Sequence, residues 1–439
     1  MHPSPRSRGF TLIELLVGTV VGSIVLLGIS MTFISQAQQY QSHASRRAIQ
    51  SSARQSLAFM ERKVRSAGYG VHPDRAVLAY DSYNVVADGS VPGHPDAIVV
   101  HSRDPLFRRT LRLATPTQLT LSNVGPALTQ PLPRGQILLL LCTLASDFAF
   151  VTVAEPAGIG ATTILLDQNP PTGDSPVRGP GTLFREQARL TSNCFNEASL
   201  VKIDRSAFYV AMFDEDGDLT TAGRVPYLML HQGVDLTNDG TIDANDAVPV
   251  AEGIEQLQVA YILNANDPAV PEAAPTILGV TAPMPANHYG EAWQASNVAI
   301  NNFVLANPPP APLWFFNTDK VPTIDPLRRE DHPANIRQIR LTVVARSTVA
   351  DQQIDGDNLM TGAAGAPLAV NGVIPWQQLE NLDMPPAGDF APSGGGFYRV
   401  LLRESITPKN LLMNAQFPPV EFLDRDLINT PNIPRPGGG

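Results

Sequence analysis

One twelve-residue stretch, residues 235–246, places side-chain oxygens at positions 1, 3, 5, 9 and 12 and a glycine at position 6. The candidate ligands are Asp235, Thr237, Asp239, the carbonyl of Thr241, Asp243 and Asp246. Calcium binds about six to eight hard oxygen ligands in loops of this length, with glycine at the sharp turn. The pattern predicts a calcium site, with Ile242 able to anchor the loop to a core. The alternative is an acidic hairpin turn, because Asn-Asp-Gly is also a strong turn signal.

A second acidic run, residues 214–218, also alternates carboxylates, but it lies between two predicted strands and is better explained as a solvated turn. The longer loop resembles the calcium loop of dockerin-type modules. It departs from that pattern at Thr237, where Asp or Asn is usual, and it has no clear flanking helix. The resemblance implies calcium as the cofactor.

Cys142 and Cys194 lack CxxC spacing and a nearby pair of histidines, which argues against structural zinc. Both lie at the edges of predicted strands. In an oxidising compartment they are expected to form a disulfide, and the alternative is a pair of buried thiols.

Composition argues against nucleic-acid binding and against catalysis. The chain has 31 basic and 41 acidic residues and a net charge of −10, so it offers no broad basic surface. It contains no HExxH, GxSxG or P-loop, and its eight histidines are dispersed, as expected for surface or core positions. We therefore expect no enzyme activity. Forty prolines and a charged fraction of only 16% also disfavour a helical bundle.

The N-terminus determines the compartment. Residues 10–34 contain a single charge, Glu14, and a helix of that length spans about 37 Å against a hydrocarbon core of about 30 Å. Arg6 and Arg8 precede this segment without any acid, so the positive-inside rule keeps residues 1–9 in the cytoplasm and sends the remainder across the membrane.

The junction before this segment, residues 8–16, reads RGFTLIELL and resembles the leader of type IV pilins and type II secretion pseudopilins. The resemblance implies that prepilin peptidase cleaves between Gly9 and Phe10 and methylates the amine of Phe10. It also implies that Glu14 pairs with a neighbouring subunit's N-terminal amine during assembly. A lone carboxylate in an apolar helix needs such a partner. An ordinary signal anchor with an incidental glutamate is the alternative.

A long helix is predicted to continue beyond the membrane. Five apolar residues recur at spacings of four, four, three and four, which forms one helical stripe: Ile49, Ala53, Leu57, Met60 and Val64. Gly68 and Gly70 are expected to end the helix. The apolar span contains no proline, unlike that of bulk pilins, which disfavours a role as the repeating shaft subunit.

The rest of the chain contains short β-rich runs separated by Pro, Gly and Asp, without intervening helical periodicity. An α+β, pilin-like fold follows, in which antiparallel sheets cover the helix stripe. The predicted strands are residues 97–101, 118–121, 136–141, 163–166, 200–203, 207–212, 254–263, 336–344 and 396–402.

Four stretches, residues 57–70, 251–261, 336–347 and 397–402 with 410–411, resemble the PilW family of minor pilins. The expected parts are a leader at 1–9, a membrane half of the helix at 10–34, an amphipathic half at 35–68 and a β-rich head at 69–439. Residues 264–333 hold twelve prolines and form an insertion between two late strands. The apolar residues 313–316 within it either pack onto the head or face a partner.

The resemblance implies a minor pilin that primes assembly of a type IV pilus and forms part of its tip. Its partners would be other minor pilins, the major pilin, a tip adhesin, prepilin peptidase and the inner-membrane assembly platform. It would reside in the inner membrane with a periplasmic head, and at the pilus tip after assembly. The alternatives are a GspJ-like minor pseudopilin of type II secretion, and a membrane-anchored calcium-dependent adhesin or hydrolase with a pilin leader.

Overall fold

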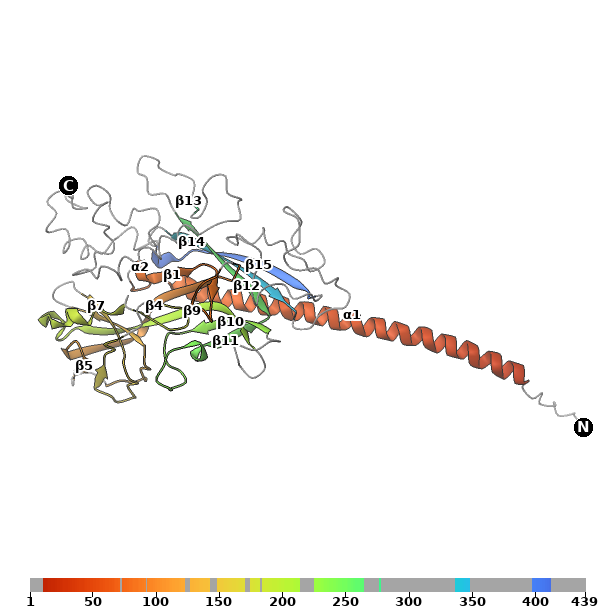
Figure 1. The fold of residues 1–439 in the computed structure, drawn as a ribbon, viewed down its shortest axis with the longest axis horizontal. Coiled ribbons are helices and arrows are strands. Elements are labelled where there is room, and N and C mark those ends of the chain that lie inside the picture. Colours follow the sequence, from red (N-terminus) through yellow and green to blue (C-terminus); the bar gives the residue numbers. More distant parts are fainter. Residues whose placement is uncertain are drawn as a thin grey trace, which may run out of the picture.

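One long helix and a β-rich head make up the protein (Figure 1). The computed structural model describes residues 11–71, 73–91, 93–122, 127–142, 148–169, 174–181, 184–213, 225–263, 276–277, 336–347 and 397–411. Helix α1 runs unbroken over Leu12–Ser66, and its first part projects from the head. The predicted α+β, pilin-like fold is confirmed. The acidic run 214–218, residues 313–316 and almost all of the insertion lie outside the described residues.

The second half of α1 packs into the head along the predicted stripe. Ala53, Met60 and Val64 have no exposed surface, and Ile49 and Leu57 are also buried. The helix ends at Ser66, slightly before the predicted glycines, where the N–H of Ala67 donates to the carbonyl of Val64. Gly68 follows with φ +78°, and a β-carbon at this position would lie 2.8 Å from Leu411 Cδ2. Glycine is therefore required both for the backbone turn and for the close packing.

The larger sheet is antiparallel, with the order β11-β10-β9-β4-β5-β8. Strand β1 also pairs with β4, and β6 lies between β9 and β7. Its strands are β1 (Val77–Tyr80), β4 (Ala97–Ala114), β5 (Gln118–Leu121), β6 (Ile137–Leu141), β7 (Phe148–Thr152), β8 (Thr163–Leu165), β9 (Ser199–Phe213), β10 (Val225–His231) and β11 (Val248–Glu252).

The smaller sheet has the order β13-β12-β14-β15 and is also antiparallel. Its strands are β12 (Ile254–Leu263), β13 (Thr276–Ile277), β14 (Ile336–Arg346) and β15 (Arg399–Ile406). The insertion therefore connects two strands, β12 and β14, that are direct neighbours. The shorter elements are α2 (Pro73–Ala76), β2 (Tyr83–Asn84), β3 (Gly89–Ser90) and the 3-10 helices η2 (Gln187–Thr191), η3 (Asn193–Phe195) and η4 (Ala244–Asp246).

Both sheets and α1 share one hydrophobic core. Met60 of the helix, Ile98 and Phe208 of the larger sheet, and Val259 and Leu341 of the smaller sheet all belong to it. A second core lies within the larger sheet, between β5, β6, β7 and β8. The helix contacts β14 and β15 of one sheet and β4 and β11 of the other, which fixes the direction in which its exposed half leaves the head (Figure 1).

Candidate functional site

The first turn of α1 holds the predicted assembly carboxylate. Thr11 caps the helix, its hydroxyl accepting from the N–H of Glu14 at 3.3 Å, and the Glu14 carboxylate accepts from the N–H of Thr11 at 3.1 Å. This capping box places a negative charge at the positive end of the helix dipole. Glu14 is exposed, and among the described residues its carboxylate hydrogen-bonds only to Thr11, so it remains available to another chain. Gly9 and Phe10 lie outside the described residues.

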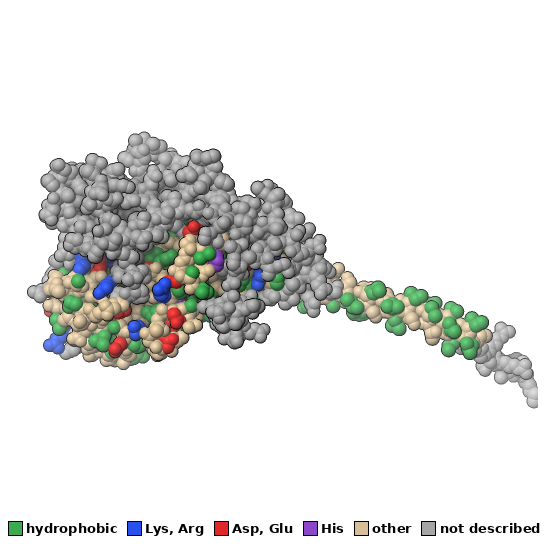
Figure 2. All heavy atoms as spheres, viewed as in Figure 1, with side chains coloured by type: hydrophobic (Ala, Val, Ile, Leu, Met, Phe, Trp, Pro, Cys, Tyr) green, Lys and Arg blue, Asp and Glu red, His purple; other side chains and the backbone are tan. Residues whose placement is uncertain are grey.

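The apolar surface that follows Glu14 has no cover within the chain. Leu12–Ala37 is long and apolar enough to span a membrane, and none of it is buried. Figure 2 shows hydrophobic side chains along this projecting part of α1. Leu12, Leu26 and Phe33, for example, are 78%, 65% and 68% exposed. An exposed apolar surface of this length is typical of a segment that contacts lipid or other protein chains.

The acidic loop at residues 235–246 is closed by its own two terminal carboxylates. Asp246, 1% exposed, accepts from the N–H groups of Leu236 at 2.7 Å, Thr237 at 2.9 Å and Asp243 at 3.0 Å. Asp235, also buried, accepts from the N–H groups of Asn238 at 2.6 Å and Gly240 at 2.9 Å. The predicted first and last calcium ligands therefore face backbone donors.

The remaining predicted ligands bind locally. Asp239 is exposed and accepts from the N–H of Thr241 at 2.8 Å, and Asp243 caps η4. Ile242 packs beside Gly135 and Gly179, in line with its expected anchoring role. Among the described residues, no three His, Cys, Asp or Glu side chains are grouped to hold a metal ion. Calcium binding stays a prediction, since the Asp235 and Asp246 oxygens would have to bind the ion while they also accept hydrogen bonds from these backbone N–H groups.

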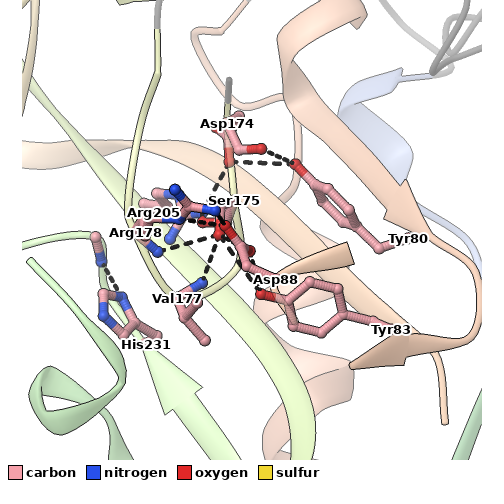
Figure 3. Close-up of polar contacts among 10 residues, drawn as sticks. Tyr80, Tyr83, Asp88, Asp174, Ser175, Val177, Arg178, Arg205 and His231 are labelled. Carbon is pink, nitrogen blue, oxygen red and sulfur yellow. Dashed lines mark hydrogen bonds and ion pairs between the residues drawn. The ribbon is translucent and has the colours of Figure 1, made fainter. Parts of the chain in front are cut away.

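A buried ion pair stabilises the larger sheet beside this loop (Figure 3). Arg205 of β9 lies 2.9 Å from Asp174, with both side chains 1% exposed, and it donates to the Ser175 carbonyl at 2.6 Å. Tyr80, the last residue of β1, donates a hydrogen bond from its hydroxyl to Asp174. Burial raises the pKa of Asp174, while Arg205 opposes that shift. The pair joins a strand to a segment about thirty residues away in sequence.

Around this ion pair, further polar side chains bind one another (Figure 3). Tyr83 donates to Asp88 at 2.6 Å, and Asp88 also accepts from Ser175 and pairs with Arg178. Burial raises the pKa of Tyr83, so its phenol stays protonated. No member is left as an activated nucleophile beside a base, and we interpret the cluster as structural.

His231 connects the end of β10 to the acidic loop. Its Nδ1 accepts from the N–H of Gly233 at 2.8 Å, so its Nε2 donates to the carbonyl of Asp243, also at 2.8 Å. Burial lowers the pKa of His231 to about 4. His94 and His101 are buried as well, so of the surface and core positions expected for the histidines, these occupy the core.

The two cysteines are neighbours and are not joined by a disulfide in this structure. Cys142 Sγ lies 3.1 Å from the carbonyl oxygen of Cys194, and Cys142 is buried. The structure thus brings together the two cysteines that the sequence predicted to pair, and both are free thiols. Oxidation to a disulfide in the oxidising compartment stays a prediction, testable by non-reducing peptide mass spectrometry.

Sequence reasoning missed the buried polar cluster. One signal was present: the polar residues 204–206 interrupt an otherwise apolar stretch, which was interpreted as a break between two strands. In the structure β9 continues through them, and Arg205 finds Asp174. A buried arginine needs a paired anion, but the sequence does not show which acid supplies it.

Comparison with known families identifies the N-terminal signal. Residues 4–30 match the prokaryotic N-terminal methylation motif, a segment that includes Gly9, Phe10 and Glu14. The match supports a type IV pilin-like or pseudopilin-like protein with a membrane-associated N-terminal helix. Comparison with curated proteins and with solved structures found no match.

Proposed function

We propose that this chain is a PilW-like minor pilin, a non-enzymatic subunit that primes assembly of a type IV pilus and forms part of its tip. One observation carries the proposal: a continuous helix, Leu12–Ser66, whose outer half is wholly exposed and starts with a carboxylate inside a methylation motif. A soluble domain would leave no such helix uncovered. Before assembly, the bilayer would hold this half while the head lies in the periplasm.

Glu14 would guide the subunit from the bilayer into the filament. A carboxylate near the bilayer interior is unfavourable by a few kcal/mol unless it is paired. Within the described part of the chain, it accepts hydrogen bonds from the capping residue Thr11. The methylated amine of a neighbouring subunit keeps its positive charge and would form the missing ion pair. Assembly would then bury the charge and the apolar helix surface in one step.

A tip position fits the shape of the chain better than a shaft position. The residues after α1 number 373 of 439, and the projecting helix span lacks proline. A subunit that repeats closely along a fibre has to pack its heads side by side, which a large head with a long insertion hinders. A minor pseudopilin of type II secretion shares the methylation motif and is the second candidate.

Immunolabelling of sheared filaments tests the proposal. We expect label at filament ends, and loss of pili when the gene is deleted. Label along the shafts would contradict a tip role, and loss of protein export with intact pili would favour the pseudopilin.

Processing provides an independent test. We expect the mass of the mature chain to lack residues 1–9 and to carry one added methyl group at Phe10. A mature protein that begins at Met1 or near residue 38 would exclude the pilin pathway.

A further inference from the structure

Four arginines form a row on the exposed side of α1 within the head. Arg47, Arg54, Arg62 and Arg65 are all exposed, and their spacings are seven, eight and three residues. At about 100° and 1.5 Å per residue, these spacings keep them within an arc of about 80° over about 27 Å. We call this surface the arginine stripe. It lies away from the buried residues Ala53, Met60 and Val64.

The arginine stripe has little internal neutralisation. Glu61 pairs with Arg65, and Arg62 lies over the ring of Phe59. Among the described residues, no ion pair is formed by Arg47, Arg54 or Arg62. Four exposed guanidinium groups beside one carboxylate repel one another, and a row of anions from outside would relieve that repulsion.

Charge is unevenly divided between the helix and the rest of the chain. The chain has 31 basic and 41 acidic residues. Helix α1 contains six of the basic and two of the acidic residues, and the segment before it contains two basic residues and no acidic one. The chain after the helix therefore holds 23 basic and 39 acidic residues, a net charge of −16. A cationic helix surface is thus attached to an acidic head, and a subunit of similar charge distribution would offer the complementary surface.

We propose that the arginine stripe binds a row of carboxylates on the head of a neighbouring subunit in the same filament, one that carries the same N-terminal motif. The inference rests on the proposed function. A neighbour that covers Leu12–Ala37 lies along α1, and Arg47 is only ten residues, about 15 Å, further along that helix. Arginine suits this contact because its planar fork binds a carboxylate through two parallel hydrogen bonds.

Other anionic surfaces fit the arginine stripe less well. Anionic lipid attracts cations within about one Debye length, roughly 8–10 Å, whereas the stripe extends from about 15 to 42 Å beyond Ala37. A nucleic acid would meet repulsion from the acidic head. A protein partner that presents a short row of carboxylates avoids both difficulties.

Zero-length cross-linking in piliated cells tests the contact. Arg54→Lys keeps the charge and supplies an amine, which a carbodiimide couples to a touching carboxylate as an amide. Arg112→Lys, at an exposed position on β4, is the matched control, and the wild type corrects for Lys63. We expect at least tenfold more cross-link at position 54, to an Asp or Glu of a protein with the methylation motif. No excess over the control, or a partner without the motif, would overturn the proposal.

Charge reversal separates this proposal from the proposed function. We expect Arg54→Glu with Arg62→Glu to lower the amount of protein in sheared filaments at least tenfold, with leader removal and membrane level unchanged. The exposed pair Arg112→Glu with Arg185→Glu is the control and should assemble normally.

If the wild type is absent from filaments, the proposed function fails and the stripe contact fails with it. If the wild type is present and the Arg54/Arg62 reversal matches it, only the stripe contact fails. Binding of labelled duplex DNA by the full-length protein, lost on reversal while assembly stays normal, would instead assign the stripe to nucleic acid and overturn the proposal.

Discussion

Along α1, every residue of the span Leu12–Ala37 is exposed, whereas Ala53, Met60 and Val64 have no accessible surface. The two halves share one backbone and differ in how apolar side chains are arranged around it. The outer half is apolar on all sides, and the inner half carries a single apolar stripe. An apolar stripe on one side of a helix can be covered by the chain's own sheets. A helix that is apolar on all sides needs an apolar environment that the chain itself does not supply.

The same contrast holds for polar groups. Glu14 in the outer half has one neighbouring side chain as its partner, while Asp96 in the head accepts from the N–H groups of Ser82 and Val259 and so ties the two sheets together. We infer that changes in the outer half alter assembly and leave stability intact, and that changes to buried polar groups in the head lower stability. The predictions below test this separation.

The largest effect is expected at Glu14. Glu14→Ala removes the carboxylate that would pair with a neighbour's amine, so incorporation into sheared filaments should fall at least tenfold. Membrane insertion, leader removal and the melting temperature of the full-length protein in detergent should not change, because Glu14 is exposed and hydrogen-bonds within its own helical turn. Glu14→Gln separates charge from size. Normal incorporation of both variants would show that Glu14 is incidental.

In the head, the largest loss of stability is expected on breaking the buried ion pair. Arg205→Met leaves Asp174 buried without its cation, which should lower the free energy of unfolding by about 3–5 kcal/mol. Arg178→Met is the matched control, because Arg178 is 56% exposed and its pairing with Asp88 should contribute less than about 1 kcal/mol. Denaturant unfolding measures both. Equal losses in the two variants would contradict the structural role of the Arg205–Asp174 pair.

A smaller effect should follow acidification. His231 has a pKa of about 4 in the folded protein and about 6.5 when unfolded, so between these pH values the unfolded state binds a proton that the folded state does not. Stability should therefore decrease as pH falls from 6.5 to 4, by about 2–4 kcal/mol from His231. Burial also lowers the pKa of His101, which adds in the same direction.

Unfolding curves of wild type and His231→Gln at several pH values measure this contribution. The variant should show a flatter decline over the same pH range. An identical pH dependence would show that His231 is not protonated on unfolding in this window.

The smallest effect concerns calcium. At ten times its dissociation constant, an ion that binds only the folded protein stabilises it by about 1.4 kcal/mol. The melting temperature of the full-length protein should be higher in millimolar calcium than in chelator. Asp239→Ala should abolish this difference because it removes a predicted calcium ligand, and it should leave the fold intact because Asp239 is exposed and hydrogen-bonds within the loop. Equal melting of the wild type in both conditions would leave the loop as an acidic turn closed by Asp235 and Asp246.

The local sequence pattern was sufficient to predict the long helix and several strands. The stripe residues Ile49, Met60 and Val64 are buried as their periodicity indicates, and β5 and β12 have the predicted bounds. The predicted strands at 200–203 and 207–212 are one strand, β9, because paired neighbours satisfy the polar residues between them. Strands β1, β7, β10 and β11 were not predicted. Each is a strand through pairing with a neighbour: β1 with β4, β7 with β6, and β10 with β11.

The sequence by itself determined the long helix, its apolar half that is long enough to span a membrane, the position of Glu14 and the α+β class, since each depends on spacing within a few turns or on composition. Tertiary structure alone decided which acid pairs with Arg205, how Asp96 joins the sheets, and that Asp246 closes the acidic loop. Those outcomes depend on groups brought together from distant or oppositely directed segments, where burial makes one specific partner necessary. Local periodicity indicates that a residue will be buried, and only the packed chain determines what it then binds.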